Sequence, residues 1–532
     1  MKNTRLFMFA ACTLFLAACG RQTVKIMTPP DASNRVLFGA EQLQTTLDKA
    51  GYQVMMQQGD TTFSDPEIKT ILLTEVNDTT LKKEGFHITT TGNLTRVSGR
   101  DGSGVIYGSR ELIDRVNDSD GKLDFPEELK DGPEMVLRGA CVGLQKMTYL
   151  PGHGVYEYPY TPESFPWFYD KEQWIKYLDM LVANRMNSLY LWNGHPFASL
   201  VKLEDYPFAL EVDEETFKKN EEMFSFLTEE ADKRGIFVIQ MFYNIILSKP
   251  FAEHYGLKTQ DRNRPITPLI ADYTRKSIAA FIEKYPNVGL LVCLGEAMCT
   301  VEDDVEWFTK TIIPGVKDGL QALGRTDEPP LLLRAHDTDC KLVMDAALPI
   351  YKNLYTMHKY NGESLTTNEP RGPWSKIHTD LSSLGSIHIS NVHILANLEP
   401  FRWGSPDFVQ KAVQAMHNVH GANALHLYPQ SSYWDWPYTA DKLPNGEREF
   451  QLDRDWIWYQ TWGRYAWNSH RDRADEIGYW NHQLGQFYGT SDENAGNIRI
   501  AYEESGEIAP KLLRRFGITE GNRQTLLLGM FM

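Results

Sequence analysis

Apolar segments and amphipathic segments alternate eight times between about residues 134 and 438. Most of the apolar segments lack the polar alternation of a half-exposed strand, which is typical of parallel strands covered by helices. The predicted strands lie at 136–144, 188–192, 236–242, 288–294, 331–335, 353–358, 393–398 and 424–428. Eight strand–helix units in about 300 residues predict a (β/α)8 TIM barrel. An open doubly wound sheet is the alternative, but such sheets rarely reach eight regular units.

The segments between the predicted strands repeat their apolar residues with the 3.6-residue period of a helix. One such stripe is Trp174, Tyr177, Leu178, Leu181 and Val182, and another is Phe408, Ala412, Val413, Met416 and Val419. We therefore assign residues 133–440 to the barrel.

Weaker signals of the same kinds lie on either side of the barrel. Strands are predicted at 24–27, 68–76 and 86–91 and helices at 34–50 and 104–116, so residues 19–132 should form a small α/β domain. A helical, tryptophan-rich pattern fills 441–532 and ends in an apolar run, which leaves open whether this C-terminal region is complete.

The first twenty residues have the pattern of a bacterial export signal. Lys2 and Arg5 precede an apolar run at 7–18 that is too short to cross a bilayer. The run ends in Leu16-Ala17-Ala18-Cys19, which resembles the lipobox of bacterial lipoproteins. The resemblance implies that residues 1–18 are removed and that acylated Cys19 anchors the protein to a bacterial membrane, facing the periplasm or the cell exterior. An ordinary cleavable signal peptide with an incidental cysteine is the alternative.

Charge and cysteine content exclude several classes of partner. The net charge of −16 argues against nucleic acid, because binding phosphates requires clustered Lys and Arg. The cysteines beyond residue 19 show no zinc-binding spacing, so we expect no metal and no cofactor. Aromatic residues make up 12% of the chain, which suits a protein that stacks rings on sugars.

A glycine-rich segment carries a family resemblance. It reads Ser98-Gly-Arg-Asp-Gly-Ser-Gly-Val-Ile-Tyr-Gly108 and is followed by Glu111-Leu112. It resembles a signature of the accessory domains that precede the barrels of family 20, 67 and 84 glycoside hydrolases. A dinucleotide-binding fold is the alternative, but no GxGxxG motif opens a helix after the first strand. The resemblance implies a glycoside hydrolase.

Polar and aromatic residues end or follow the predicted strands, at the end of the barrel where active sites of this fold lie. They include Trp192, Asn193, His195, Asn244, Glu296, His336, Asp337, His358, Lys359, Tyr360, Glu363, Glu399, Arg402, Tyr428 and Trp434. Carboxylates suit acid–base chemistry, amides suit sugar hydroxyls, and aromatic rings suit the sugar face. This combination also predicts a carbohydrate substrate.

Glu296 is the first candidate for the catalytic acid. It follows the fourth predicted strand after one glycine, and partial desolvation there should raise its pKa toward neutrality. A helix cap is the alternative, because 300–306 begins a helix. In the resembling families a Glu after strand four is the acid. The family 20 hallmark pairs it with Asp, whereas this chain has Gly295-Glu296, which argues against that family's substrate-assisted mechanism.

The second carboxylate has three candidates in the sequence. In family 67 α-glucuronidases the base comes from carboxylates on later strands, a position that Glu399 matches, with Asp337 or Glu363 as its companion. Glu399 could instead be a buried partner of Arg402. The best hypothesis is an α-glucuronidase-like, inverting hydrolase with its carboxyls about 6.5–9.5 Å apart. A family 20- or 84-like hexosaminidase and a non-catalytic glycan-binding lipoprotein are the rivals.

The remaining candidates are predicted to bind substrate. His358, Lys359 and Arg402 could hold a sugar carboxylate, or form ion pairs on the rim. Trp192 and Trp434 could stack on sugars, or only pack. The residues at 336–339 match no standard metal site, so we expect hydrogen bonding there. Arg138 begins the first predicted strand, at the opposite end of the barrel, and is expected to be structural.

Overall fold

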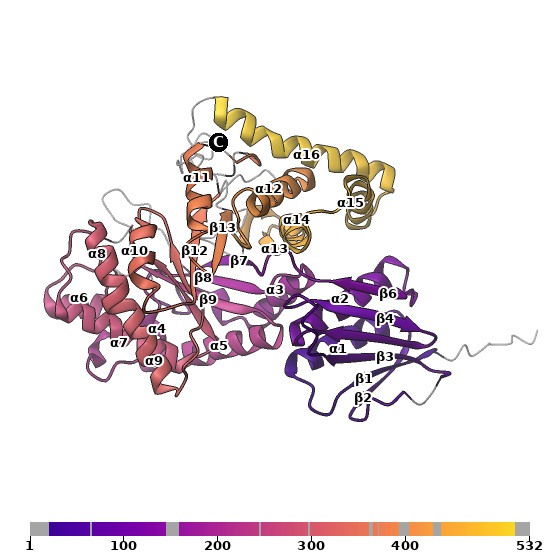
Figure 1. The fold of residues 1–532 in the computed structure, drawn as a ribbon, viewed down its shortest axis with the longest axis horizontal. Coiled ribbons are helices and arrows are strands. Elements are labelled where there is room, and N and C mark those ends of the chain that lie inside the picture. Colours follow the sequence, from indigo (N-terminus) through magenta and orange to yellow (C-terminus); the bar gives the residue numbers. More distant parts are fainter. Residues whose placement is uncertain are drawn as a thin grey trace, which may run out of the picture. The chain divides into compact units, whose positions relative to one another are not determined.

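The computed structural model describes residues 21–63, 66–144, 159–243, 246–295, 298–360, 365, 367–370, 372–392, 404–428 and 438–515 (Figure 1). The side chains at 374, 438–441 and 508–515 are outside this description. The chain forms two compact units. The first contains the chain up to Asp78 together with Phe86–Lys130, and the second contains Thr79–Gly85 and the chain from Asp131 onward.

A six-stranded sheet of order β2-β1-β3-β5-β4-β6 is the framework of the first unit. Its elements are β1 (Thr23–Thr28), α1 (Asn34–Lys49), β2 (Gln53–Gln58), β3 (Lys69–Glu75), β4 (Phe86–Thr91), β5 (Leu94–Gly99), α2 (Gly102–Asp118) and β6 (Glu128–Asp131). The predicted α/β domain is confirmed, although the sequence analysis missed β2, β5 and β6. The glycine-rich signature has a packing role here. A Cβ atom on Gly108 would lie 2.4 Å from Val97 Cγ1, so the glycine lets α2 lie directly on β5.

Eight parallel strands close into a barrel in the second unit. They are β7 (Leu137–Gly143), β8 (Ser188–Trp192), β9 (Phe237–Tyr243), β10 (Val288–Cys293), β11 (Leu331–Arg334), β12 (Leu354–Lys359), β13 (Ile387–Val392) and β14 (Ala424–Leu427). The predicted TIM barrel is confirmed, and the bounds of seven strands agree with the prediction to within one residue.

The seventh strand was predicted wrongly. The described strand β13 ends at Val392, whereas the prediction began at residue 393, and 393–398 lie outside the described residues. The cause is buried polar groups in β13. His388 lies 2.9 Å from Thr356 Oγ1, and Asn391 Nδ2 lies 3.1 Å from His426 Nδ1. These polar residues interrupt the apolar run by which a buried strand is recognised.

Helices alternate with the strands around the barrel. They are η1 (Pro166–Tyr169), α3 (Lys171–Ala183), α4 (Phe197–Leu200), η2 (Pro207–Ala209), α5 (Glu214–Lys233), α6 (Lys249–Tyr255), α7 (Pro268–Lys284), α8 (Val301–Trp307), η3 (Phe308–Ile312), α9 (Ile313–Ala322), α10 (Cys340–Ala347), α11 (Gly372–Leu381) and α12 (Pro406–Asn418). The predicted stripe of α3 is buried throughout. In the stripe of α12, Val419 is an error, because it lies past the helix end and is 51% exposed.

A hairpin and four helices complete the second unit. They are β15 (Tyr438–Lys442), β16 (Arg448–Phe450), α13 (Gln451–Arg454), α14 (Trp456–Trp467), α15 (Arg473–Tyr488) and α16 (Asp492–Arg515). The predicted helical region is therefore present, and the hairpin was missed. Trp458 Nε1 donates to the carbonyl of Tyr428 at 3.1 Å, which joins α14 to the end of β14. Within the described part of the chain, no helix has the length and apolar character needed to span a bilayer.

Candidate active site at the barrel mouth

Contacts across the barrel identify the side chains that face its interior. The Arg334 guanidinium on β11 lies 5.2 Å from the centre of the Trp192 ring on β8. Two strands, β9 and β10, separate β8 from β11 along the sheet, so these side chains can meet only through the inside. Trp192 also contacts Tyr428 on the far side, with ring centres 5.5 Å apart. The three residues thus mark the mouth of the barrel.

Two cationic residues face this mouth from neighbouring strands. Arg334 pairs in register with Met357, so Lys359, two residues further along β12, is on the same inner face. Arg334 and Lys359 are only 3% and 2% exposed. Lys359 pairs in register with Asn391. Buried cations of this kind can form charge-assisted hydrogen bonds to an anionic ligand group.

A neutral histidine lies beneath these cations. His426 contacts the Tyr190 ring with centres 3.9 Å apart and bonds to Asn391. Burial, and secondly the nearby Arg334 charge, lower the pKa of His426 to about 3. The His426 ring is therefore neutral, and the charged side chains of Arg334 and Lys359 lie above it.

The chain immediately before Glu296 is held in place. The backbone N–H of Gly295 donates to Thr338 Oγ1 at 3.0 Å, and its carbonyl accepts from Arg262 Nη2 at 3.0 Å. A Cβ atom on Gly295 would lie 1.8 Å from the carbonyl oxygen of Asp337, so only glycine fits. The helix that follows is capped by Thr300, whose side chain accepts from the N–H of Asp303 at 3.1 Å.

Asp337 is on the exposed rim. Its backbone φ is +51°, which is uncommon for a residue other than glycine. Its carboxylate is 57% exposed and lies 3.7 Å from Arg262 Nη2 and 3.9 Å from His336 Nε2. Asp337 therefore lies beside His336 and Arg262 in a solvent-exposed polar cluster, and its catalytic role stays a prediction.

Asn193 and His195 make structural contacts. Asn193 Nδ2 donates to the carbonyl of Leu144 at 2.7 Å, which links the ends of β7 and β8. His195 Nε2 lies 2.9 Å from Tyr273 Oη on α7, between barrel and helix, and burial lowers its pKa to about 3. These hydrogen bonds connect both side chains to the protein framework. A role for them in substrate binding stays a prediction.

The structure separates the adjacent residues His358, Lys359 and Tyr360. The sequence analysis placed all three on one rim, but side chains in a strand alternate between faces. The His358 ring lies 5.4 Å from His378 on α11, outside the barrel. Tyr360 Oη donates to the carbonyl of Asn368 at 2.9 Å on the same outer side. Of the three, only Lys359 is on the inner face.

Several predicted residues lie outside the described part of the chain. They are Cys19, Asn244, Glu296, Glu363, Glu399, Arg402 and Trp434. Their roles stay predictions. The sequence analysis also missed Arg334, because it considered the residue after each strand and not the last inward-facing residue of the strand itself.

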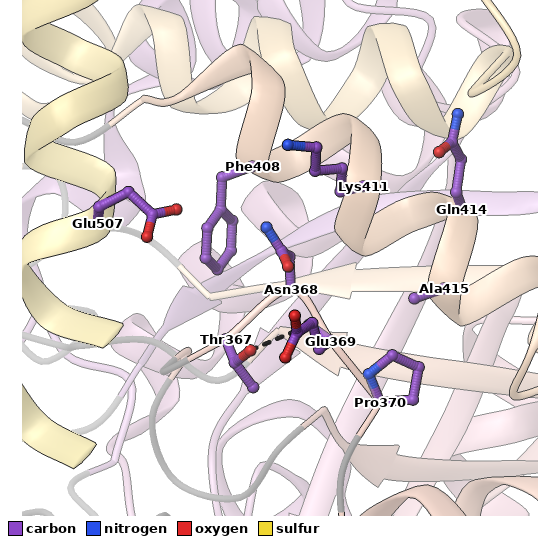
Figure 2. A pocket seen from close by; sticks show the side chains of 9 residues that line it. All are labelled: Thr367, Asn368, Glu369, Pro370, Phe408, Lys411, Gln414, Ala415 and Glu507. Carbon is purple, nitrogen blue, oxygen red and sulfur yellow. Dashed lines mark hydrogen bonds between the residues drawn. The ribbon is translucent and has the colours of Figure 1, made fainter. Parts of the chain in front are cut away.

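A pocket of about 520 Å³ lies on the outer side of the barrel (Figure 2). It is lined by Thr367, Asn368, Glu369, Pro370, Phe408, Lys411, Gln414, Ala415 and Glu507. None of the described predicted site residues lines it. Among the described residues, no group of three or more His, Cys, Asp or Glu side chains could hold a metal ion.

Comparison with known proteins identifies the family. No family model and no curated protein matches the sequence. Among solved structures, a protein described as a GH138 enzyme targeting pectin rhamnogalacturonan II is 74% identical with a TM-score of 0.91. The match covers 95% of this chain and 72% of that chain. The chain belongs to glycoside hydrolase family GH138.

More distant structures share the fold of this GH138 protein. The β-N-acetylhexosaminidase from Bacteroides fragilis NCTC 9343 is 13% identical with a TM-score of 0.54, over 90% of this chain and 95% of that one. The Streptomyces plicatus N-acetyl-β-hexosaminidase is also 13% identical with a TM-score of 0.54, over 88% and 91%. The prediction of a barrel glycoside hydrolase is confirmed. The likeness to hexosaminidases concerns the fold alone.

Proposed function

We propose that this GH138 hydrolase cleaves a glycosidic bond in an acidic plant polysaccharide, rhamnogalacturonan II, beside a uronic acid unit. Arg334 and Lys359 would bind the carboxylate of that unit. The proposal keeps the α-glucuronidase-like hypothesis from the sequence in a broader form. Its substrate comes from the 74% identical relative, whose description names this pectin.

The observation that carries the proposal is the pair of buried cations at the mouth. A guanidinium can bind a carboxylate through two parallel N–H···O bonds, and a low dielectric strengthens both. The Trp192 ring lies against the Arg334 guanidinium and supports its orientation.

Glu296 remains the proposed general acid, and the choice of its partner changes. The argument for Glu399 assumed a strand at 393–398, whereas the described strand β13 spans Ile387–Val392 and residues 393–403 lie outside the described part of the chain. By contrast β12 ends at Lys359, four residues before Glu363. We therefore propose Glu363 and Glu399 as equal candidates for the second carboxylate, with inversion as the expected outcome if a water fits between the pair.

The test of the substrate class compares two arginine variants on rhamnogalacturonan II oligosaccharides. Arg334→Met should lower kcat/KM by about 10²–10³, because it removes two charge-assisted bonds. Arg275→Met is the matched control, since Arg275 on α7 is 45% exposed and pairs with Asp318, and it should change kcat/KM less than about threefold. Carboxyl-reduced oligosaccharides should be poor substrates for the wild type. On these substrates the wild type and Arg334→Met should have similar kcat/KM values. Normal turnover of acidic substrate by Arg334→Met would refute the proposal.

The mechanism has its own test. Glu296→Gln should keep the fold and lower turnover by about 10²–10⁴, since it loses proton donation. Proton NMR of the first-formed product anomer distinguishes inversion from retention. Glu363→Gln and Glu399→Gln, assayed side by side, identify the second carboxylate, because only the true partner should match the loss seen at Glu296.

We also propose that Cys19 is acylated and holds the enzyme on a bacterial membrane, facing the periplasm or the exterior. The lipobox-like sequence before it supports this. Cys19→Ala should move the enzyme from the membrane fraction to the soluble fraction. Retention of the variant in membranes would show that another element anchors it.

A further inference from the structure

A chain of hydrogen-bonded side chains lies behind β12, on the outer face of the barrel. His378 on α11 bonds through Nδ1 to His388 Nε2 on β13 at 2.8 Å. His388 Nδ1 lies 2.9 Å from the hydroxyl of Thr356 on β12. His378 Nε2 lies 3.1 Å from the main-chain carbonyl of Lys359. All three side chains are at most 1% exposed.

The donor and acceptor of each hydrogen bond follow from the last acceptor in the series, the Lys359 carbonyl. A carbonyl oxygen can only accept, so His378 Nε2 must carry a proton and donate it to Lys359. Neutral His378 then accepts at Nδ1, and His388 must donate from Nε2. His388 Nδ1 accepts in turn and takes the single hydroxyl proton of Thr356. The hydroxyl also lies 3.2 Å from the carbonyl of Leu381, but one proton serves the nearer nitrogen.

This series of hydrogen bonds can form only while His378 and His388 are both neutral. Burial is the main cause that lowers the pKa of His388, to about 3, and the pKa of His378 well below its ordinary value. Coulombic contributions from His358, His388 and His420 act in the same direction on His378. A second proton on His378 would place two N–H groups against each other, so the arrangement allows one tautomer for each ring.

The carbonyl that accepts the last of these hydrogen bonds belongs to Lys359, whose side chain faces the barrel mouth. His358 Nδ1 also lies 3.1 Å from this oxygen, so two imidazoles hold it. The next N–H along the chain, that of Tyr360, donates to the carbonyl of Asn391 at 2.7 Å. The backbone that carries Lys359 is therefore fixed from its outer side.

We propose that His378 is a positioning residue for glycan hydrolysis, and that it acts by holding the main chain of Lys359 so that the Lys359 ammonium meets the substrate carboxylate. This inference rests on the function proposed for Lys359. Displacement of a binding group by about 1 Å can cost as much as two powers of ten in rate, so loss of this hold should reach the substrate.

The first test separates hydrogen bonding from packing. His378→Leu removes the donor and should raise KM for acidic oligosaccharide about tenfold, the scale of one hydrogen bond to a charged group, with kcat within about threefold. His378→Gln has an amide N–H and a carbonyl that can replace both bonds, and it should restore KM. His420→Leu is the matched control, because that ring stacks on His378 at 4.7 Å but bonds to Ser375 instead of Lys359. His420→Leu should leave KM unchanged.

The second test asks whether the effect passes through Lys359. In a Lys359→Met background, where KM is already raised, His378→Leu should add no further change. Thr356→Val, which keeps the side-chain volume and removes the far donor, should raise KM two- to threefold in case His378→Leu does not fold. Circular dichroism and thermal melting establish that each assayed variant is folded.

The outcomes distinguish the two proposals. If Lys359→Met leaves KM unchanged, the function proposed for Lys359 fails. The positioning role fails on its own if Lys359→Met raises KM while His378→Leu and Thr356→Val do not. It also fails if His420→Leu matches His378→Leu, or if the effects of Lys359→Met and His378→Leu multiply.

Discussion

The ion pair between Glu84 and Arg138 provides a sharp stability prediction for the barrel unit. The Arg138 side chain is fully buried at the start of β7, where the sequence predicted a structural role. Its Nη2 donates to Glu84 Oε2 at 2.7 Å, and its Nη1 and Nε donate to the carbonyls of Met135 and Arg185 at 2.6 and 2.8 Å. Asn187 Nδ2 donates to both Glu84 oxygens, at 2.9 and 3.0 Å.

Glu84→Gln is the informative substitution, because it nearly preserves the side-chain shape, removes the counter-charge and replaces one of the two accepting oxygens by an N–H donor. The guanidinium would stay buried among neutral acceptors, which costs about 3–5 kcal/mol for a buried pair that loses one partner. Urea unfolding should therefore show a lower midpoint with an unchanged slope. Tryptophan fluorescence is a suitable probe, since the Trp467 ring centre lies 5.3 Å from the Arg138 guanidinium.

The control and the double variant decide the reasoning. Glu214→Gln removes an exposed partner of Lys202, with side chains 60% and 47% exposed, and should leave the urea midpoint almost unchanged. Glu84→Gln combined with Arg138→Met should cost less than the sum of the single changes, because the unpaired charge is gone. A cost below about 1 kcal/mol for Glu84→Gln would refute the argument from burial.

Two further predictions concern acid stability and the chain before Glu296. The pKa values of His195, His388 and His426 are lowered from 6.5 to about 3, so the unfolded state binds protons that the native state does not. Stability should fall as pH drops below about 6.5, by up to roughly 1.4 kcal/mol per pH unit per histidine, and equal urea midpoints at pH 7 and pH 5 would contradict this. Gly295→Ala should lower both the melting temperature and the turnover, because its Cβ would collide with the Asp337 carbonyl at 1.8 Å. Wild-type melting and turnover for this variant would show that the loop can adapt.

The barrel could be predicted from the sequence because its strands are buried on both faces, so each appears as an apolar run. The strand Ser188–Trp192 was predicted with its observed bounds. Strand β13 was not, since His388 and Asn391 are buried with polar partners that lie far away in the sequence. A hydropathy scale scores each residue by itself and ignores its partners. It therefore cannot distinguish a buried, hydrogen-bonded histidine from an exposed one.

The site was predicted only in part, for a related reason. The rule that active sites lie at strand ends selects a rim, but the two-residue period decides which of its residues face inward. In β12 this period places Lys359 on the inner face of the barrel and His358 on the outer face, where His358 contacts His378. Arg334 belongs to the strand itself, so a search of the loops after strands could not find it.

The strand that the sequence pattern failed to locate, β13, carries buried polar residues in place of a simple apolar core face. On β12 and β13 the outer face carries Thr356, His358 and His388, whereas the outer face of an ordinary barrel strand packs apolar side chains against helices. Burying polar groups costs stability unless each is bonded, and here the bonds run in one direction and end on the carbonyl of Lys359. The buried polar groups lie behind Lys359, whose side chain faces the mouth. Departures from the usual apolar pattern of a strand are expected at functional sites, and this one is consistent with such a role. The polar residues that obscured β13 in the sequence are thus the same ones that, in our proposal, hold the substrate-binding side of β12 in place.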